Sequence, residues 1–118
     1  HNRATADVTA EDWNDSLHRN LTTCFSVTRA CLGAMSERGY GRIVNVASTS
    51  GPVQAFLGDP GYHAAKAGII GLTRSIAKEC YKFGITSNAK AWMPFVSFTY
   101  SVRSSGESAR PLGFSNPW

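Results

Sequence analysis

Apolar side chains recur at steps of three and four residues through the first third of the chain. This spacing puts them on one face of an α-helix, so it predicts a long amphipathic helix over about residues 10–37. Thr9 and Asp12 fit a capping box at its start, and Gly39 and Gly41 are expected to end it. The predicted apolar stripe consists of Trp13, Leu17, Leu21, Cys24, Phe25, Thr28, Cys31, Leu32 and Met35.

The pattern changes at Arg42–Ala47, which is rich in β-branched residues and almost continuously apolar. Such a run predicts a strand that is covered on both faces, as in a parallel sheet. Glycines and prolines over residues 51–61 predict a loop, and a second amphipathic helix is expected over about 61–83. Ile85–Ala89 is a short predicted strand. Strand, helix and strand in this order predict a right-handed βαβ unit with a parallel strand pair.

Two glycines, Gly68 and Gly71, lie inside the second predicted helix. A glycine in a helix interior costs up to about 1 kcal/mol relative to alanine. We therefore expect another part of the backbone to approach the helix closely at these two positions.

The predicted elements indicate an α/β fold, namely the C-terminal part of a Rossmann-like, doubly wound parallel sheet. Residues 1–91 carry these elements as one partial domain. Residues 92–118 lack clean periodicity and end rich in Ser, Gly, Pro and Arg, so we expect a divergent, irregular tail there. Two strands alone leave edges and faces of a sheet uncovered, and the chain opens with His1 rather than Met, so we expect a fragment of a longer protein.

Composition narrows the functional classes open to the 118-residue chain. The net charge of +4 is spread out, without the basic and aromatic patch that a nucleic-acid interface needs. No apolar run reaches the length of a transmembrane helix. The three cysteines show no metal-ligand spacing, so we expect no metal site. We interpret them as small core residues of a protein in a reducing compartment, the cytoplasm: Cys24, Cys31 and Cys80.

Tyr62 and Lys66 are the first candidates for chemistry, because they lie one helical turn apart at the start of the second predicted helix. A phenol normally keeps its proton at neutral pH. A nearby ammonium group and the positive end of a helix both favour the phenolate, so this pair could exchange a proton with a substrate. Ser48 follows the first predicted strand, at the edge where open α/β sheets bind ligands. The spacing alone also fits Tyr62 as an amphipathic surface residue.

Five motifs occur in order along the chain: Asn20-Leu21-Thr22-Thr23, Gly41-Arg42-Ile43-Val44-Asn45-Val46-Ala47-Ser48, Tyr62-His63-Ala64-Ala65-Lys66-Ala67-Gly68, Gly71-Leu72-Thr73-Arg74-Ser75 and Gly84-Ile85-Thr86-Ser87-Asn88-Ala89. Together they resemble the short-chain dehydrogenase/reductase family. The similarity is greatest to the branch that contains the 3-oxoacyl-carrier-protein reductases. It covers about residues 8–91.

The resemblance implies a Rossmann fold and NAD- or NADP-dependent hydride transfer between a ketone and a secondary alcohol of a small-molecule substrate. Tyr62 would be the general acid and base, and with Lys66 it would contact the nicotinamide ribose. Lys66 would also favour the phenolate, while Ser48 would orient and polarise the substrate carbonyl. Asn20 would anchor a water that links Lys66 to solvent, although an Asn here can also bond to the backbone of its own helix. The intact parent is expected to form a homo-oligomer through the two long helices.

Three departures from the family pattern limit what this chain is expected to do. The glycine-rich phosphate loop is absent, because the one Gly-x-Gly, at Gly39 and Gly41, precedes a strand and opens no helix. Lys90–Pro94 stands where the family has a turn with Pro and Gly beside the nicotinamide, and residues 95–118 match nothing expected of the substrate-covering region. We therefore expect the chain alone to bind dinucleotide weakly.

Two other functions stay open at this point. The chain could be a non-catalytic fragment that associates through its two long helices, with Leu17 and Ile76 as positions to test. It could also keep the fold and act as an epimerase or dehydratase, since the Ser, Tyr and Lys set does not exclude either. His63 is interpreted as packing or solvated, and Phe56 and Leu57 as pocket lining or loop packing.

Overall fold

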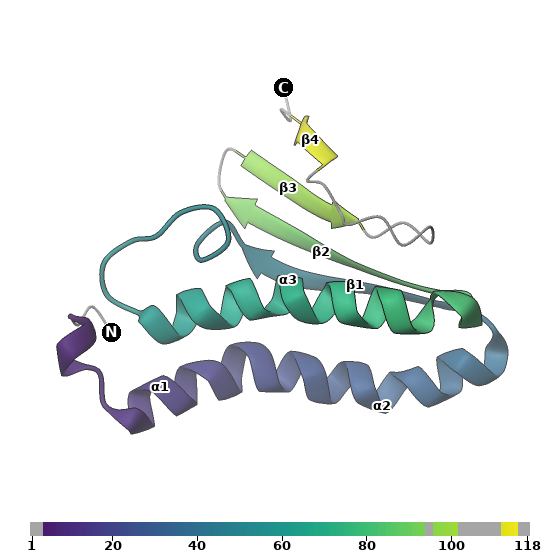
Figure 1. The fold of residues 1–118 in the computed structure, drawn as a ribbon, viewed down its shortest axis with the longest axis horizontal. Helices are drawn as coiled ribbons and strands as arrows, with labels where there is room; N and C mark the ends of the chain where they lie inside the picture. The colour runs from purple at the N-terminus through teal and green to yellow at the C-terminus, as the bar shows by residue number, and fades with distance from the viewer. Residues whose placement is uncertain (1–3, 94–95, 102–111, 116–118) are drawn as a thin grey trace.

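A computed structural model of the chain describes residues 4–93, 96–101 and 112–115. The described part is a layer of helices on a four-stranded sheet (Figure 1). The α-helices are α1 (Ala10–Leu17), α2 (Thr23–Arg38) and α3 (Pro60–Cys80). The strands are β1 (Gly41–Ser48), β2 (Ile85–Met93), β3 (Val96–Ser101) and β4 (Leu112–Ser115). Shorter helical turns are η1 (Thr5–Asp7), η2 (His18–Thr22) and η3 (Tyr81–Phe83).

The first predicted helix is confirmed over residues 10–38, with one change of winding inside it. α1 and α2 are joined by the π-helical turn η2, so the helix continues through a locally widened turn. The capping box is also confirmed, because Asp12 N–H donates to Thr9 Oγ1 at 3.0 Å and Thr9 N–H donates to the Asp12 carboxylate at 3.4 Å. Gly39 ends α2 in the left-handed conformation with φ 65°.

Only part of the predicted apolar stripe faces the core. Four of its members pack against the buried clusters: Leu21, Cys24, Leu32 and Met35. The prediction is wrong for three others, whose side chains are exposed: Trp13, Phe25 and Cys31. The physical reason is that the nine predicted positions cover a wider arc of the helix than α3 and β1 can bury.

The predicted parallel βαβ unit is confirmed. β1 pairs with β2 in parallel, from Gly41 opposite Ile85 to Ser48 opposite Trp92. α3 forms the connection between these strands and packs on both of them. It begins at Pro60, one residue earlier than predicted, and its α-helical part ends at Cys80, followed by η3.

The prediction of an irregular tail over residues 92–118 is wrong for three stretches, namely 92–93, 96–101 and 112–115. β2 continues to Met93, and β3 then pairs antiparallel with it, followed by β4 beside β3. The reason is that the outer edge of β2 satisfies its backbone groups by pairing with β3, which sequence periodicity does not reveal. Residues 94–95, 102–111 and 116–118 lie outside the described part of the chain.

The strand β1 is covered on one face only within the described structure. Ile43, Asn45 and Ala47 are buried, whereas Val44 and Val46 are 66% and 67% exposed. The prediction that both faces are covered is therefore wrong for the described residues. The reason is visible in Figure 1, where all three α-helices lie on the same side of the sheet.

The core lies between this helical layer and the strands, in two clusters. The first is centred on Ile69, which is 2% exposed, and the second on Ile85, which is 1% exposed. Ile76 belongs to the second cluster and is 6% exposed. It therefore packs inside the protein. The prediction that Ile76 is a position at which to test association through the helices is wrong, because its side chain is not on the surface.

A buried polar chain connects the helical layer to β1. The Cys24 thiol donates to Asn45 Oδ1 at 3.2 Å, and Asn45 Nδ2 donates to Thr73 Oγ1 at 2.9 Å. The Thr73 hydroxyl in turn donates to the Ile69 carbonyl at 2.8 Å. Thr73 is fully buried, so these bonds satisfy polar groups that water does not reach. This series of hydrogen bonds therefore fixes how α2, β1 and α3 meet.

The two helical glycines differ in their surroundings. A Cβ atom at Gly68 would lie 2.8 Å from Leu21 Cδ2, whereas a Cβ atom at Gly71 would meet nothing within 4 Å. The expected close approach thus occurs at Gly68, but it comes from a side chain rather than a backbone. The expectation is wrong for Gly71.

Candidate active site

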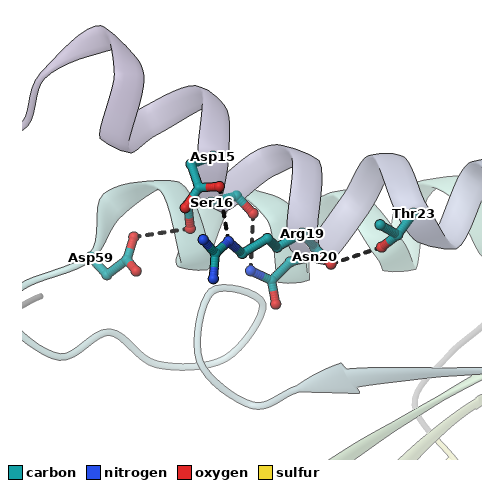
Figure 2. A network of polar contacts seen from close by, with 6 residues as sticks. All are labelled: Asp15, Ser16, Arg19, Asn20, Thr23 and Asp59. Carbon is teal, nitrogen blue, oxygen red and sulfur yellow. Dashed lines mark hydrogen bonds and ion pairs between the residues drawn. The ribbon is translucent and has the colours of Figure 1, made fainter.

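The start of α3 is fixed by Asp59. Its carboxylate caps the helix by accepting the Tyr62 N–H at 2.8 Å, and Pro60 occupies the first helical position. The Ser16 hydroxyl from α1 donates to the same Asp59 oxygen at 3.3 Å (Figure 2). A Cβ atom at Gly61 would lie 2.8 Å from Ser16 Cβ, so glycine permits α1 to pack closely here. These contacts set the position of Tyr62.

Lys66 connects Tyr62 to the carboxyl end of β1. Its ammonium group lies 5.5 Å from the centre of the Tyr62 ring and donates to the Val46 carbonyl at 3.2 Å. Burial raises the pKa of the nearby Cys24 thiol, and the Lys66 charge partly opposes that rise. The ammonium group thus lies where α3, β1 and the first helix meet.

Ser48 is the last residue of β1 and is buried. Its Oγ accepts the Ser50 N–H at 3.1 Å. The following loop returns to α3, because a Cβ atom at Gly51 would collide with the His63 carbonyl. Lys66 contacts β1 at the Val46 carbonyl, two residues before Ser48. Ser48 therefore lies at the same end of the strand as the Lys66 ammonium group. Of the three predicted residues, Tyr62 and Lys66 lie close together, with the Lys66 ammonium group 5.5 Å from the centre of the Tyr62 ring.

Asn20 lies in the π-helical turn η2. Its Nδ2 donates to the Ser16 carbonyl at 2.9 Å, the intrahelical bond that the sequence left open as an alternative (Figure 2). A groove of about 420 Å³ is lined by Asn20 together with Cys24 and Val46. Asn20 and the backbone that Lys66 contacts therefore border the same groove, and widened helical turns of this kind are frequent at functional sites.

An exposed ion pair lies next to these residues. Arg19 Nε donates to Asp15 Oδ1 at 2.8 Å, and this hydrogen bond, with the attraction between the charges, raises the pKa of Arg19. The Thr23 hydroxyl donates to the Arg19 carbonyl at 2.7 Å (Figure 2). Exposed pairs contribute little stability, so these contacts support the helix surface rather than a site.

The described residues offer groups suited to a ribose of a dinucleotide but no place suited to its pyrophosphate. The Lys66 ammonium and the Tyr62 hydroxyl are donors suited to ribose hydroxyl groups. The pyrophosphate has no such place in the described part, because both capped α-helix starts, at Thr9 and Asp59, carry a carboxylate that would repel it. A dinucleotide is therefore not fully accommodated by these residues.

Two residues of the site were not singled out by the sequence prediction. Asp59 caps α3, and the Asp-Pro pair at 59–60 was the available signal for a helix start. His63 was interpreted as packing or solvated, but its ring bonds to the preceding loop through Phe56 N–H and the Asp59 carbonyl. The sequence carried no signal for these two contacts, because they depend on how the loop before α3 folds back onto the helix.

The described residues hold neither a membrane-spanning helix nor a metal-binding cluster. No helix there combines the length and apolar character needed to span a membrane. No group of three His, Cys, Asp or Glu side chains in that part of the chain could hold a metal ion.

The fold agrees with comparisons to known proteins. The profile of the short chain dehydrogenase family matches residues 1–104, and the chain belongs to this family. Among solved structures, one described as a short-chain dehydrogenase/reductase from Burkholderia xenovorans superimposes with a TM-score of 0.71 at 35% identity. That match covers 75% of this chain and 35% of the other.

Curated relatives include reductases of oxoacyl substrates. Acetoacetyl-CoA reductase of Rhizobium meliloti is 43% identical over 82 residues, which are 70% of this chain and 34% of the relative. The 3-oxoacyl-acyl-carrier-protein reductase FabG of Vibrio cholerae is 42% identical over 81 residues, which are 69% of this chain and 33% of the relative. The chain thus spans about a third of the length of these relatives.

Proposed function

We propose that the protein to which this chain belongs is an NAD- or NADP-dependent oxidoreductase that interconverts a ketone and a secondary alcohol, with Tyr62 as general acid and base. The observation that carries the proposal is the position of the Lys66 ammonium group, 5.5 Å from the Tyr62 ring and bonded to the Val46 carbonyl. The reduced nicotinamide, when bound, supplies the hydride.

Tyr62 supplies the proton in the direction of ketone reduction. The carbonyl oxygen gains negative charge as the hydride arrives, and the Tyr62 hydroxyl donates its proton to that oxygen. The positive charge of Lys66 stabilises the phenolate that remains. In alcohol oxidation the same groups work in reverse, with the phenolate accepting the hydroxyl proton.

Ser48 and Asn20 have supporting roles in this proposal. Ser48 Oγ accepts the Ser50 N–H through a lone pair, and its own O–H can donate to the substrate carbonyl. That bond strengthens as charge develops on the carbonyl oxygen, so it favours the transition state over the substrate. Asn20 borders the groove that Val46 also lines, and in this proposal it anchors a water that returns the proton from solvent.

The substrate class follows from the named relatives. Acetoacetyl-CoA reductase and 3-oxoacyl-acyl-carrier-protein reductase are both similar to this chain, so we propose a 3-oxoacyl thioester. The three cysteines are free thiols, which supports a reducing compartment, the cytoplasm.

The test is a chimera in which the matching 81 residues of the Vibrio cholerae FabG are replaced by the corresponding residues of this chain. We expect the chimera to reduce acetoacetyl-CoA with NADPH, and Tyr62→Phe to lower kcat by about 10²- to 10⁴-fold. The matched control is Tyr40→Phe, because Tyr40 is an exposed tyrosine that precedes β1. A loss smaller than about tenfold in Tyr62→Phe would contradict the general-acid role. Dehydration of a 3-hydroxyacyl thioester without change in the nicotinamide would instead support the dehydratase alternative.

Cofactor binding by the 118-residue chain itself is a separate measurement. Titration with NADPH, followed by the fluorescence of the cofactor, should show no saturation at micromolar concentrations. The physical reason is the carboxylate at both capped helix starts. Micromolar affinity would contradict this reasoning.

A second candidate function is association through the helical layer. Phe25 and Val27 on α2 are 46% and 66% exposed, so apolar side chains stay uncovered on two flanks of this helix. We propose that the intact parent forms a homo-oligomer through this layer. Phe25→Glu should shift the oligomer to monomer in size-exclusion chromatography, with Ala30→Glu, an exposed change on another side of the same helix, as the control. Retention of the oligomer in Phe25→Glu would rule this surface out.

A further inference from the structure

We propose that His63 is a positioning residue that holds the loop between β1 and α3 so that Phe56 forms an apolar wall beside Tyr62. The wall would contact an alkyl or acyl portion of the substrate next to its carbonyl group. This inference rests on the proposed function, in which Tyr62 exchanges a proton with that carbonyl.

Both ring nitrogens of His63 are used by the loop. Nδ1 lies 2.6 Å from the Asp59 carbonyl oxygen, and the Phe56 N–H donates to Nε2 at 3.1 Å. A carbonyl oxygen only accepts and a backbone amide only donates, so Nδ1 carries the proton and Nε2 carries the lone pair. The contacts therefore require a neutral imidazole in one defined tautomer.

The backbone of His63 contacts the other end of the same loop. A Cβ atom at Gly51 would collide with the His63 carbonyl, and Gly51 has a φ of 100°, which favours glycine. Gly51 N–H also donates to the Gln54 carbonyl at 2.7 Å. His63 thus touches the loop at its first glycine through the backbone and at Phe56 through the side chain.

These contacts determine where the Phe56 ring lies. The rings of Phe56 and His63 are 4.4 Å apart, and the rings of Phe56 and Tyr62 are 6.3 Å apart. Phe56 is still 54% exposed and Leu57 is 90% exposed, and both line an open pocket of about 570 Å³ together with Pro60. Apolar surface that stays exposed beside a proton donor fits an apolar ligand better than water.

The contact with Phe56 requires Nε2 to stay unprotonated. Protonation of Nε2 removes the lone pair that the Phe56 N–H needs, because an imidazolium ion only donates. The titratable groups next to the ring are the Asp59 carboxyl, which caps the same helix, the Tyr62 phenol, whose ring centre is 6.2 Å away, and the Lys66 ammonium beside that phenol. None of these replaces Nε2 as an acceptor for the Phe56 amide.

The first experiment uses the ¹⁵N-labelled 118-residue chain and needs no activity. Long-range ¹H–¹⁵N spectra should show His63 protonated at Nδ1. His63→Ala should raise the exchange rate of the Phe56 amide about tenfold, which is the effect expected from one lost hydrogen bond. His63→Gln, which keeps an acceptor near the Nε2 position, should retain most of the protection. His18→Ala is the matched control, because His18 is exposed on η2.

The amide of Ile69 in α3 reports whether a variant is still folded, because Ile69 lies in the core. A proton on Nε2, or a Phe56 amide that exchanges equally fast in wild type and His63→Ala while Ile69 stays protected, would overturn the proposal.

The second experiment measures His63→Ala and Phe56→Ala in the FabG chimera. Both should raise KM for acetoacetyl-CoA about tenfold with a smaller change in kcat, and His63→Gln should restore most of the loss. A KM that stays at the wild-type value in both variants would overturn the role in substrate binding. A chimera that is inactive throughout, while Phe56 protection still depends on His63, contradicts the proposed function and supports the positioning contacts.

Discussion

The buried polar chain from Cys24 to Ile69 allows a stability prediction whose size follows from its geometry. Thr73→Val replaces a hydroxyl by a methyl of similar volume, so it leaves almost no cavity in the core. It removes the acceptor that Asn45 Nδ2 uses at 2.9 Å. Thr73 has no exposed surface, so water cannot take the place of the hydroxyl without opening the core.

The expected cost is that of an unsatisfied buried donor, about 1–3 kcal/mol. The lost bond from the Thr73 hydroxyl to the Ile69 carbonyl adds little, because a carbonyl within a helix also receives a backbone N–H. For a chain of this size each kcal/mol corresponds to roughly 4 °C in Tm, so Tm should fall by about 4–12 °C.

The assay is urea unfolding followed by far-ultraviolet circular dichroism, with the free energy of unfolding obtained by linear extrapolation. Thr23→Val is the matched control, because the Thr23 hydroxyl makes the same kind of bond, to the Arg19 carbonyl at 2.7 Å, on the exposed side of the helix. The control should change stability by less than about 0.5 kcal/mol. Equal effects of the two substitutions would refute the reasoning.

A double-mutant cycle sharpens this test. In an Asn45→Leu background, Thr73→Val leaves no amide donor without a partner, so its cost should fall by about 1 kcal/mol or more. Additive effects would show that Asn45 and Thr73 do not act through their hydrogen bond.

Two other predictions follow from the surroundings of single residues. Gly71→Ala should stabilise the chain by about 0.5–1 kcal/mol in thermal unfolding, since helix propensity improves and the added methyl meets no other atom. Gly68→Ala should stabilise the chain less, because the Leu21 side chain must move to make room. A destabilised Gly71→Ala variant would indicate that another molecule packs there. Iodoacetamide should alkylate exposed Cys31 before Cys24, whose pKa is raised by burial, and Cys24 labelling should accelerate only at more alkaline pH. Mass spectrometry of timed samples checks the order, and faster labelling of Cys24 would contradict it.

Local signals in the sequence were sufficient for the elements that hold the site. The Thr9 and Asp12 pair, the apolar run of β1 and the one-turn spacing of Tyr62 and Lys66 each depend on near neighbours, and the structure contains the cap, the strand and the contact. The resemblance to the short-chain dehydrogenase family added the relation of Ser48 to this pair. The family is confirmed, whereas the roles of the residues stay proposals.

Contacts between distant segments were not predictable in the same way. The burial of Ile76 depends on how β1 and β2 cover α3, and the pairing of β3 with β2 depends on a free strand edge. The role of His63 depends on a loop whose glycines bring Phe56 back over the helix. None of these is encoded in a periodic pattern, because each is decided by which surfaces meet after the elements have formed.

The bare face of β1 has a practical consequence for anyone producing the chain. Within the described sheet β1 is an edge strand, and it presents Val44 and Val46 beside a row of unpaired backbone groups. An exposed apolar edge strand favours aggregation, so the recombinant chain should collect in inclusion bodies. Replacement of either valine by lysine should increase the soluble fraction of the chain.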